Sequence, residues 1–241
     1  MLEKAALVIG AGDGTGGAIA RRFAREGFVA CVVRRTADKL APLVHDIEAA
    51  GGRVRAYGRD ARKEDQVVAL VDEIEHDVGP IEVAAFNVGA NVPASILEET
   101  ARKYFKIWEM ACFGGFLMGR EVARRMVPRG RGTILFTGAT ASVRGREHFA
   151  AFAGAKHALR ALAQSMAREL GPQGIHVAHV LIDGAIDTEF IRTTFPQTYA
   201  LKDQGGLLDP AHIADQFWML HVQPRDAWTF ELDLRPWMER W

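Results

Sequence analysis

The sequence predicts an α/β fold in which helices cover both faces of a doubly wound, parallel sheet of seven strands. Short apolar runs alternate with longer helical patterns along the chain, and several runs are continuously apolar and rich in Val and Ile. Strands without a polar face are typical of a parallel sheet that is buried on both sides. A repeated β-α-β order implies right-handed crossovers and therefore a doubly wound sheet.

The predicted elements follow one another without a repeat or a linker. The strands are Ala5–Ile9, Phe28–Val33, Arg53–Tyr57, Ile81–Phe86, Gly132–Phe136, His176–Ile182 and Thr229–Leu234. The helices are Thr15–Glu26, Ala37–Ala50, Lys63–Val78, Glu98–Met126, His148–Leu170 and Pro210–Leu220. We therefore expect a single domain over residues 1–241. The stretch Asp183–Leu208 shows no clear periodicity, and because such long loops are usually functional, we expect a substrate lid at 183–208.

Composition narrows the function classes. Of 241 residues, 49% are apolar and 25% charged, which excludes disorder. Thirty basic and 30 acidic residues balance, which argues against a nucleic-acid partner. No apolar run reaches the roughly 18–20 residues that span a bilayer, and the first strand begins at Ala5, so we expect a cytoplasmic protein without a membrane partner. The two cysteines predict no disulfide, and the histidines lack metal-ligand spacing, so no metal is expected.

A glycine-rich turn, Gly10–Gly17, lies between the first strand and the first helix. Such glycines let the backbone turn tightly and approach a pyrophosphate, whose charge rests on the helix N-terminus. The turn therefore predicts a Rossmann-type dinucleotide site, although a turn that is merely flexible is the alternative. Two spacings fit: G-x-G-x-x-G with Gly12, Gly14 and Gly17, and G-x-x-x-G-x-G with Gly10, Gly14 and Gly16. Because a carboxylate would repel a pyrophosphate, we expect Asp13 to cap the helix instead.

The end of the second strand indicates which dinucleotide binds. Sites for NAD(H) often place an acidic residue there to bind the ribose 2′-hydroxyl. This chain has Arg34 and Arg35 instead, and a guanidinium can bind a 2′-phosphate bidentately. We therefore predict NADP(H) in preference to NAD(H). A solvated arginine pair at a strand end is the alternative.

Over essentially its whole length the sequence resembles the short-chain dehydrogenase/reductase family. The matching segments occur in the family's order: the turn with Gly10, Gly12, Asp13, Gly14, Thr15 and Gly16, then Asp60-Ala61, Asn87-Val88-Gly89, Lys156, and Asp183-Gly184 with Ile186 and Thr188. The resemblance implies that Asp60 contacts the adenine, that Lys156 holds the nicotinamide ribose, and that the segment ending at Thr188 meets the nicotinamide amide. It also implies a homodimer or homotetramer built on the helices Glu98–Met126 and His148–Leu170, which carry aromatic residues beyond one face.

The sequence departs from the family at its catalytic positions. The family's Tyr, four residues before the Lys, is Phe152 here, and its Ser is Ala139. Its Asn falls at Ala111, so only Lys156 remains of the family's set. The i, i+4 spacing keeps Phe152 and Lys156 on one helix face. The chain thus resembles an atypical branch in which Phe replaces the Tyr.

Four residues are candidates for the missing acid. Thr140 offers a hydroxyl beside the Ser position, and His148 precedes Phe152 by one turn. Asp183 stands at the end of the sixth strand, where α/β sheets bind ligands, and Tyr199 lies in the expected lid. The alternatives are a surface histidine, a loop-anchoring aspartate and a packed lid tyrosine.

Two functional hypotheses follow. The first is an NADP(H)-dependent oxidoreductase that acts on a small carbonyl or hydroxyl compound with an altered acid–base arrangement. The second is a non-catalytic NADP(H)-binding protein with a regulatory or interaction role. Loss of a positioned acid lowers a rate by about 10²–10⁴-fold, which leaves a slower reductase possible.

Overall fold

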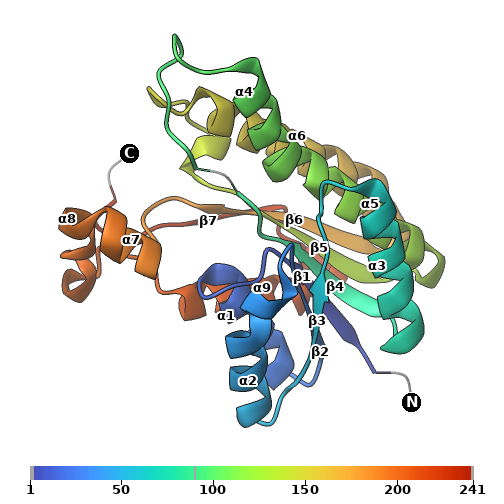
Figure 1. Cartoon of the computed structure of the whole chain (residues 1–241). Coiled ribbons are helices and arrows are strands. Elements are labelled where there is room, and N and C mark those ends of the chain that lie inside the picture. Colours follow the sequence, from blue (N-terminus) through green and yellow to red (C-terminus); the bar gives the residue numbers. More distant parts are fainter. Residues whose placement is uncertain (1–2, 90, 240–241) are drawn as a thin grey trace.

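A computed structural model describes residues 3–89 and 91–239, so the ends of the predicted range 1–241 lie outside the described residues. In the described chain, seven parallel strands form one sheet in the order β3-β2-β1-β4-β5-β6-β7 (Figure 1). This arrangement confirms the predicted fold class. The strands are β1 Ala5–Ile9, β2 Val29–Arg34, β3 Arg53–Gly58, β4 Ile81–Phe86, β5 Gly132–Thr137, β6 Ile175–Ile182 and β7 Glu231–Leu234.

The strand order reverses at β1, which pairs with β2 on one side and with β4 on the other. β1, β4 and β6 are buried along their whole length, which explains why their sequences contain almost no polar residue. Open α/β sheets bind ligands beyond the carboxyl ends of the strands at such a reversal. The topology therefore places the candidate site after Ile9 and Phe86.

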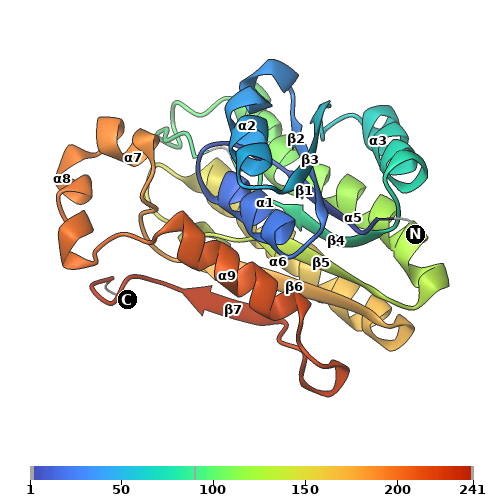
Figure 2. The ribbon, with the colours of Figure 1, turned by 90° about the horizontal axis from the view of Figure 1, so that it is seen from below.

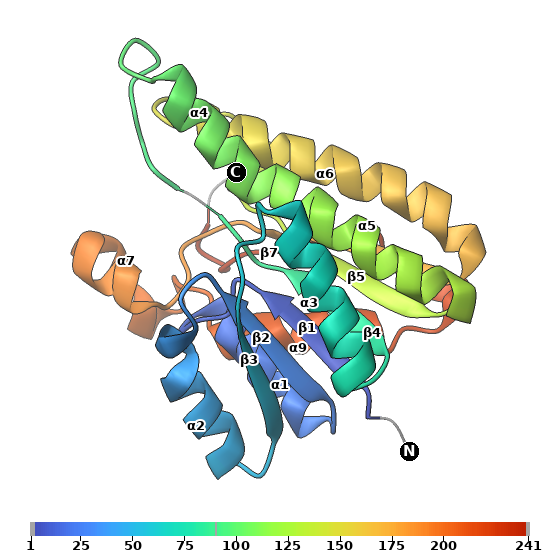
Figure 3. The ribbon, with the colours of Figure 1, turned by 45° about the vertical axis from the view of Figure 1, so that its right-hand side comes forward.

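Helices cover both faces of the sheet and bury two separate apolar layers. The longer helices are α1 Thr15–Arg25, α2 Ala41–Ala49, α3 Glu64–Asp77, α4 Ala101–Trp108, α5 Gly114–Met126, α6 Ala150–Leu170 and α9 Pro210–His221. Helices α1, α2 and α9 pack on one face, through residues such as Phe23, Ile47 and Phe217 (Figure 2). Helices α3, α5 and α6 cover the other face, with Met118 and Leu159 in its core (Figure 3). Within the described residues, no helix is long and apolar enough to cross a membrane.

The predicted helix Glu98–Met126 is interrupted. Thr100 caps α4 by accepting a hydrogen bond from the Lys103 amide, and a π-helical segment, Glu109–Phe113, separates α4 from α5. Residues five apart lie about 140° apart around an α-helix, but the wider π turn brings Trp108 and Phe113 onto one stripe. Four rings stack along that stripe, with centroids 5.9–6.0 Å apart: Phe105, Trp108, Phe113 and Phe116. We call these four residues the aromatic ladder.

Other boundaries also differ from prediction. Helix α6 begins at Ala150, because His148 has a left-handed backbone (φ 67°) and lies in the preceding loop. Strand β7 begins at Glu231, two residues later than predicted. The expected lid is not structureless: it holds α7 Glu189–Thr194, α8 Pro196–Tyr199 and a parallel bridge between Ile186 and Leu208.

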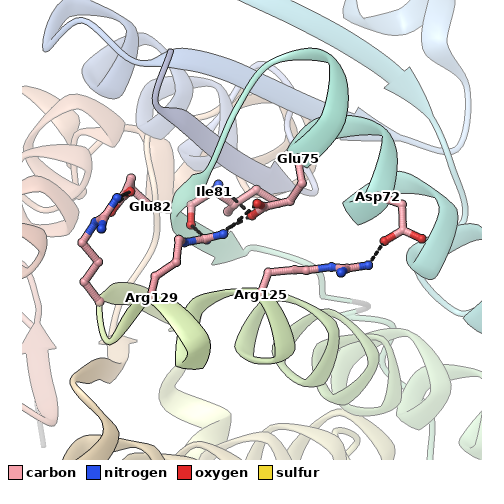
Figure 4. Close-up of polar contacts among 7 residues, drawn as sticks. Asp72, Glu75, Ile81, Glu82, Arg125 and Arg129 are labelled. Atoms are coloured by element: carbon pink, nitrogen blue, oxygen red, sulfur yellow. Dashed lines mark hydrogen bonds and ion pairs between the residues drawn. The ribbon is translucent and has the colours of Figure 1, made fainter. Parts of the chain in front are cut away.

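Ion pairs join α3 to the C-terminal end of α5 and the turn that follows it (Figure 4). They lie at the amino end of β4, away from the candidate site. Arg129 donates to both carboxylate oxygens of Glu75, at 2.7 and 3.0 Å, and to the Ile81 carbonyl at 3.0 Å. Glu75 also accepts from the Ile81 amide at 2.9 Å, and Arg125 pairs with Asp72. These contacts satisfy the backbone where β4 begins and fix its start against two helices.

A partly buried ion pair and a buried histidine fix α6 to the sheet. Arg160 on α6 donates two hydrogen bonds, of 2.6 and 2.7 Å, to Glu231 on β7. His179 on β6 donates from Nδ1 to the same carboxylate at 2.9 Å. Burial lowers the pKa of His179 to about 4, so its imidazole is neutral near pH 7 although Glu231 acts in the opposite direction. The other ring nitrogen, Nε2, lies directly over Gly138, at the start of the loop that leads to α6.

A methyl group at Gly138 would collide with this buried histidine. The Cβ of Gly138→Ala would lie 2.3 Å from His179 Nε2, far inside van der Waals contact. Since overpacking costs typically about 1–3 kcal/mol, we expect Gly138→Ala to lower the free energy of unfolding by that amount in urea titrations. Gly145→Ala is the matched control, because its Cβ meets no described atom within 4 Å. Equal stability of the two variants would contradict the described packing.

Candidate functional site

A cleft of about 520 Å³ lies at the carboxyl ends of β1 and β4, where the strand order reverses. The turn after β1, the ends of β2, β3 and β4, and the start of α7 line it. Twelve residues predicted to bind a cofactor meet there: Gly10, Gly12, Asp13, Gly14, Arg34, Arg35, Asp60, Ala61, Asn87, Val88, Gly89 and Thr188. Segments distant in sequence thus converge as the predicted motifs require, while the binding roles of these residues stay predictions.

The glycine turn has two kinds of glycine. Gly10 and Gly16 pack the turn against its support: φ is +89° at Gly10, and a Cβ at Gly16 would lie 2.3 Å from the Gly10 carbonyl oxygen. At Gly12, by contrast, the nearest atoms around a Cβ belong to the Arg34 guanidinium, at 3.6 Å. Gly14 caps α1 without a side-chain hydrogen bond, so the amides of the first turn, from Thr15 on, stay available to an anion. The turn therefore fits a pyrophosphate.

Asp13 does not cap α1, contrary to our prediction. The helix begins at Thr15, so Gly14 occupies the capping position and Asp13 lies one residue too early. Its side chain is 92% exposed, and its carboxylate lies 3.9 Å from Arg34 Nη1. Arg34 also donates to the Lys39 carbonyl oxygen at 3.5 Å. An acidic side chain thus stands beside the arginine that we expect to bind a 2′-phosphate.

Basic residues that the sequence analysis did not single out surround the same end of the cleft: Lys39, Arg59 and Arg62. The signal for two of them was present, because Arg59 and Arg62 flank Asp60 in the sequence. Arg62 donates to both Asp60 carboxylate oxygens, at 2.9 and 2.6 Å, and this contact lowers the pKa of Asp60. Asp60 is therefore an ionised acceptor held in place.

Lys156 lies behind Gly89 on the cleft wall. Its ammonium is buried and donates to the Val88 carbonyl at 3.1 Å and to the Thr137 carbonyl at 2.8 Å. A Cβ at Gly89 would lie 3.8 Å from Lys156 Cε, so the absence of a side chain there keeps the lysine within reach of the cleft. Burial lowers the pKa of Lys156 to about 8, and the nearby Cys112 acts in the opposite direction.

Apolar groups surround the position where the family carries its phenol. The Phe152 ring lies beside the ammonium, with 5.8 Å between Lys156 Nζ and the ring centroid. Ala111 and Ala155 pack in the same small apolar cluster as Phe152. The substitutions predicted at the Tyr and Asn positions therefore lie together in space and form one apolar surface.

Asp183 and Thr140 are hydrogen-bonded to each other. The Thr140 hydroxyl donates to Asp183 at 2.6 Å, and Arg144 Nη2 lies 2.7 Å from each carboxylate oxygen. Asp183 is 2% exposed and receives only donors, as expected of an ionised group that anchors the loop after β5. Neither group is placed to deliver a proton, and Arg144 was missed because its partner lies 39 residues away.

The remaining candidates lie apart from Lys156. His148 is exposed, and its carbonyl accepts from the Ala94 amide. The Tyr199 ring contacts the Lys202 ammonium at 5.6 Å, and Lys202 pairs with Asp187. Among the described residues, the contacts of Lys156 include neither candidate.

The segment after β6 approaches the glycine turn at Thr188. A Cβ at Gly14 would lie 3.1 Å from the Thr188 methyl group. Gly184 (φ +150°) packs under Pro236, and Ile186 packs against the apolar layer of α1 and α9. Neither Gly184 nor Ile186 lines the described cleft.

Known proteins resemble this chain in sequence and in fold. A family model described as short chain dehydrogenase matches residues 4–198. The chain belongs to the short-chain dehydrogenase/reductase family. A crystal structure of a short-chain dehydrogenase from Rhodopseudomonas palustris is 50% identical, with a TM-score of 0.84 over 97% of this chain and 99% of that one.

More distant relatives include named dehydrogenases. A 3beta-hydroxysteroid dehydrogenase from Mediterraneibacter gnavus is 33% identical over 72% of this chain and 63% of its own length. An alcohol dehydrogenase from Thermococcus sibiricus, solved with 5-hydroxy-NADP, is 25% identical with a TM-score of 0.86 over 98% of each chain. Within the described residues of this chain, no group of three or more His, Cys, Asp or Glu side chains could hold a metal ion.

The buried ammonium predicts how stability depends on pH. The pKa of Lys156 is about 8 in the folded chain and 10.5 for an ordinary lysine, as in the unfolded chain. Between these two pH values the unfolded chain therefore binds more protons than the folded chain. The free energy of unfolding of the wild type should therefore rise with pH across 8–10.5, relative to Lys156→Met, by about 3 kcal/mol. Urea titrations of both proteins at pH 7.5 and 10.5 measure this. Titrating groups that do not interact with Lys156 cancel in the comparison, and a difference that stays constant with pH would contradict the prediction.

Proposed function

We propose that this chain is an NADP(H)-dependent oxidoreductase that acts on small carbonyl or hydroxyl compounds through an incomplete catalytic set. The observation that supports it best is a single cleft lined by the glycine turn, Arg34 and Gly89, with the Lys156 side chain directly behind Gly89. The names of two relatives, a steroid dehydrogenase and an alcohol dehydrogenase, agree with this class of reaction. The alcohol dehydrogenase was solved as a complex with an NADP derivative.

The division of labour follows from the contacts. The amides at the start of α1 would hold the pyrophosphate, and Arg34 with Arg35 would hold the 2′-phosphate. When bound, the reduced nicotinamide supplies a hydride. Lys156 has donated two of its three N–H groups to carbonyl oxygens, so one remains for a ribose hydroxyl. Phe152 can neither donate nor accept a proton, and in this proposal the chain represents the atypical branch of the family in which Phe replaces the Tyr while the Lys stays.

The arginine pair predicts a cofactor preference. NADPH should bind more tightly than NADH, because the 2′-phosphate gains charge-assisted hydrogen bonds from guanidinium groups. In the Arg34→Ala, Arg35→Ala double variant, NADPH affinity should fall by at least about tenfold while NADH affinity changes little. Fluorescence titration with both cofactors measures this. Comparable dissociation constants in the wild type would refute it.

Asp13 provides a control of opposite sign at the same place. Its carboxylate lies 3.9 Å from Arg34 and would face a bound 2′-phosphate. Because exposed charge pairs are worth about 0.2–1 kcal/mol, Asp13→Asn should tighten NADPH by about threefold and leave NADH unchanged. A variant that loses affinity for both cofactors would instead show that Asp13 supports the turn.

Restoring the phenol tests the catalytic reading. Phe152→Tyr adds one hydroxyl beside the Lys156 ammonium, which should favour the phenolate. We expect turnover of a 1,2-diketone to rise at least about tenfold, within the range that a positioned acid supplies. Adding Ala139→Ser should raise it further and more than additively, because both groups act on one oxygen. A folded double variant that binds NADPH without any gain would favour the non-catalytic NADP(H)-binding role.

The aromatic ladder supports a homo-oligomer, as a dimer or tetramer. Phe105 is 56% exposed at one end of the stripe, and aromatic-rich helix faces are typical of isologous interfaces. Light scattering at micromolar concentration should give at least twice the mass of the chain, and Phe105→Glu should shift the protein towards the monomer. Phe195→Glu, between α7 and α8, is the matched control, since Phe195 is 46% exposed away from the ladder. A monomeric wild type would end this proposal.

A further inference from the structure

The lid, residues 183–208, has almost no core of its own. From residue 184 to residue 208 no residue is buried, and this range includes α7, α8 and the 3₁₀ turn Lys202–Gln204. Segments with few buried apolar contacts open locally at a small cost in free energy. The few contacts that the lid makes therefore decide how it sits over the cleft.

Contacts at the base hold the two ends of the lid together. Ile186 and Leu208 form a parallel bridge and pack against the apolar layer of α1 and α9. The Asp187 amide donates to the Leu208 carbonyl at 2.8 Å, and Lys202 pairs with the Asp187 carboxylate at 2.8 Å. These contacts anchor the base, whereas α7 and α8 project beyond it (Figure 2).

A segment outside the lid, residues 235–239 after β7, reaches the part that projects. Trp237 Nε1 donates a hydrogen bond to the Gln204 carbonyl at 3.1 Å. A Cβ at Gly205 would lie 3.0 Å from the same nitrogen, so the lid backbone lies directly against the indole. Trp237 thus contacts the lid where the chain returns from α8 to the base.

The segment that carries Trp237 is itself fixed. Pro236 is buried, and a Cβ at Gly184 would lie 2.6 Å from Pro236 Cδ, so these two residues are in close contact at the end of β6. The ring of Pro236 also restricts the backbone just before Trp237. Trp237 is 79% exposed, so its indole buries little area against the core. The indole is thus held at a fixed root and supports the lid rather than the core.

The lid brings three residues to the cleft. Thr188, Glu189 and Phe190 line it, and α7 begins among them at Glu189. A Cβ at Gly14 would lie 3.1 Å from the Thr188 methyl group, so the lid meets the glycine turn directly. A lid that moved away would open this side of the cleft to solvent.

We propose that Trp237 is a positioning residue that holds the lid closed over the cofactor cleft, an inference that rests on the proposed binding of NADP(H). In the closed state the lid contributes Thr188 and Phe190 to the cleft, and in the open state α7 and α8 swing away from it. The contacts of Trp237 with Gln204 and Gly205 exist in the closed state alone, so they favour that state. One hydrogen bond shifts an equilibrium by about two- to tenfold, so loss of the indole should raise the open-to-closed ratio about fivefold.

Spin labels measure this ratio without a cofactor. The native residues Cys31 and Cys112 are buried, so labels attach at Thr194→Cys on α7 and Glu48→Cys on α2, two exposed positions. Double electron–electron resonance, with unlabelled protein added to dilute contacts between copies, gives the distribution of the distance between the labels. In Trp237→Ala the ratio of the longer to the shorter distance should rise about fivefold.

Further variants distinguish positioning of the lid from general stability. Because Trp237 is mostly exposed, Trp237→Ala should leave the free energy of unfolding in urea unchanged. Trp237→Phe, which keeps a ring against Gly205 but has no N–H, should raise the open-to-closed ratio by less than Trp237→Ala. Val222→Ala is the matched control, since Val222 is 52% exposed at the end of α9, and it should change neither quantity.

Gly205→Ala tests the contact from the side of the lid. The added Cβ would press on the indole, and at φ +75° the alanine is also strained. This variant should raise the open-to-closed ratio in the wild-type background and raise it less in Trp237→Ala, where no indole meets the methyl group. The backbone strain is common to both backgrounds and cancels in this double-mutant cycle. Equal effects in the two backgrounds would overturn the proposed contact.

Cofactor release measures the consequence for the proposed function. Because a covered cofactor leaves through the open state, the dissociation rates of NADPH and NADH should both rise about fivefold in Trp237→Ala. Loss of the arginine pair, by contrast, should weaken NADPH alone. Stopped-flow displacement of each cofactor measures these rates.

The outcomes separate this inference from the function on which it rests. An unchanged distance distribution in Trp237→Ala overturns the inference, whether or not NADPH binds. A Trp237→Ala variant whose mass falls by half in light scattering, with unchanged distances, places the indole in an interface between copies and overturns the inference as well. If the lid opens as expected but direct titration detects no NADPH binding, the proposed function fails, while the contact between Trp237 and the lid stands.

Discussion

The close approach of two backbone segments, after β1 and after β4, underlies the rest of the cleft. The Asn87 amide donates to the Ile9 carbonyl at 2.8 Å, and its side-chain amide donates to the Gly10 carbonyl at 3.2 Å. A Cβ at Gly10 would lie 2.3 Å from the Asn87 carbonyl oxygen, so a larger residue would force the strands apart. This contact brings the glycine turn and Gly89 to opposite sides of one opening, which is why strand and turn positions so distant in sequence can line it together.

Two carboxylates then set the far wall. Glu231 ties β7 to α6 and β6, and Asp183 ties the end of β6 to the loop after β5. Each carboxylate accepts from an arginine outside the sheet: Glu231 from Arg160 on α6, and Asp183 from Arg144 in the loop after β5. Lys156 and Phe152 are carried by α6 between these anchors. Helix α6, which carries both residues, is thus tied to the edge strand of the sheet through Arg160.

The sequence predicted the sheet well because parallel strands such as β1 and β4 bury both faces, a pattern that local composition records. It predicted the convergence of Gly10, Arg34 and Asn87 because turns at the carboxyl edge of such a sheet must share it. It misplaced Asp13 because a helix that begins at Thr15, as predicted and as observed, has its capping position at Gly14, one residue after Asp13. Pairings such as Asp183 with Arg144, or Glu231 with Arg160, depend on side-chain directions across the fold and leave no periodic trace in the sequence.

The π-helical segment between α4 and α5 also constrains how many residues the chain can have at this point. Ile107 and Ala111 pack against α6, while Met118 packs against the sheet and Leu117 is fully buried, so different neighbours fix the rotation of the two halves of this long helix. Removing one residue from Glu109–Phe113 would restore a plain α-helix and turn the second half by about 100° against the first. Leu117 would then leave the core as Trp108 and Phe113 parted. This part of the chain should therefore accept substitutions far more readily than a change in length, although it lies in a helix near the surface rather than in the sheet.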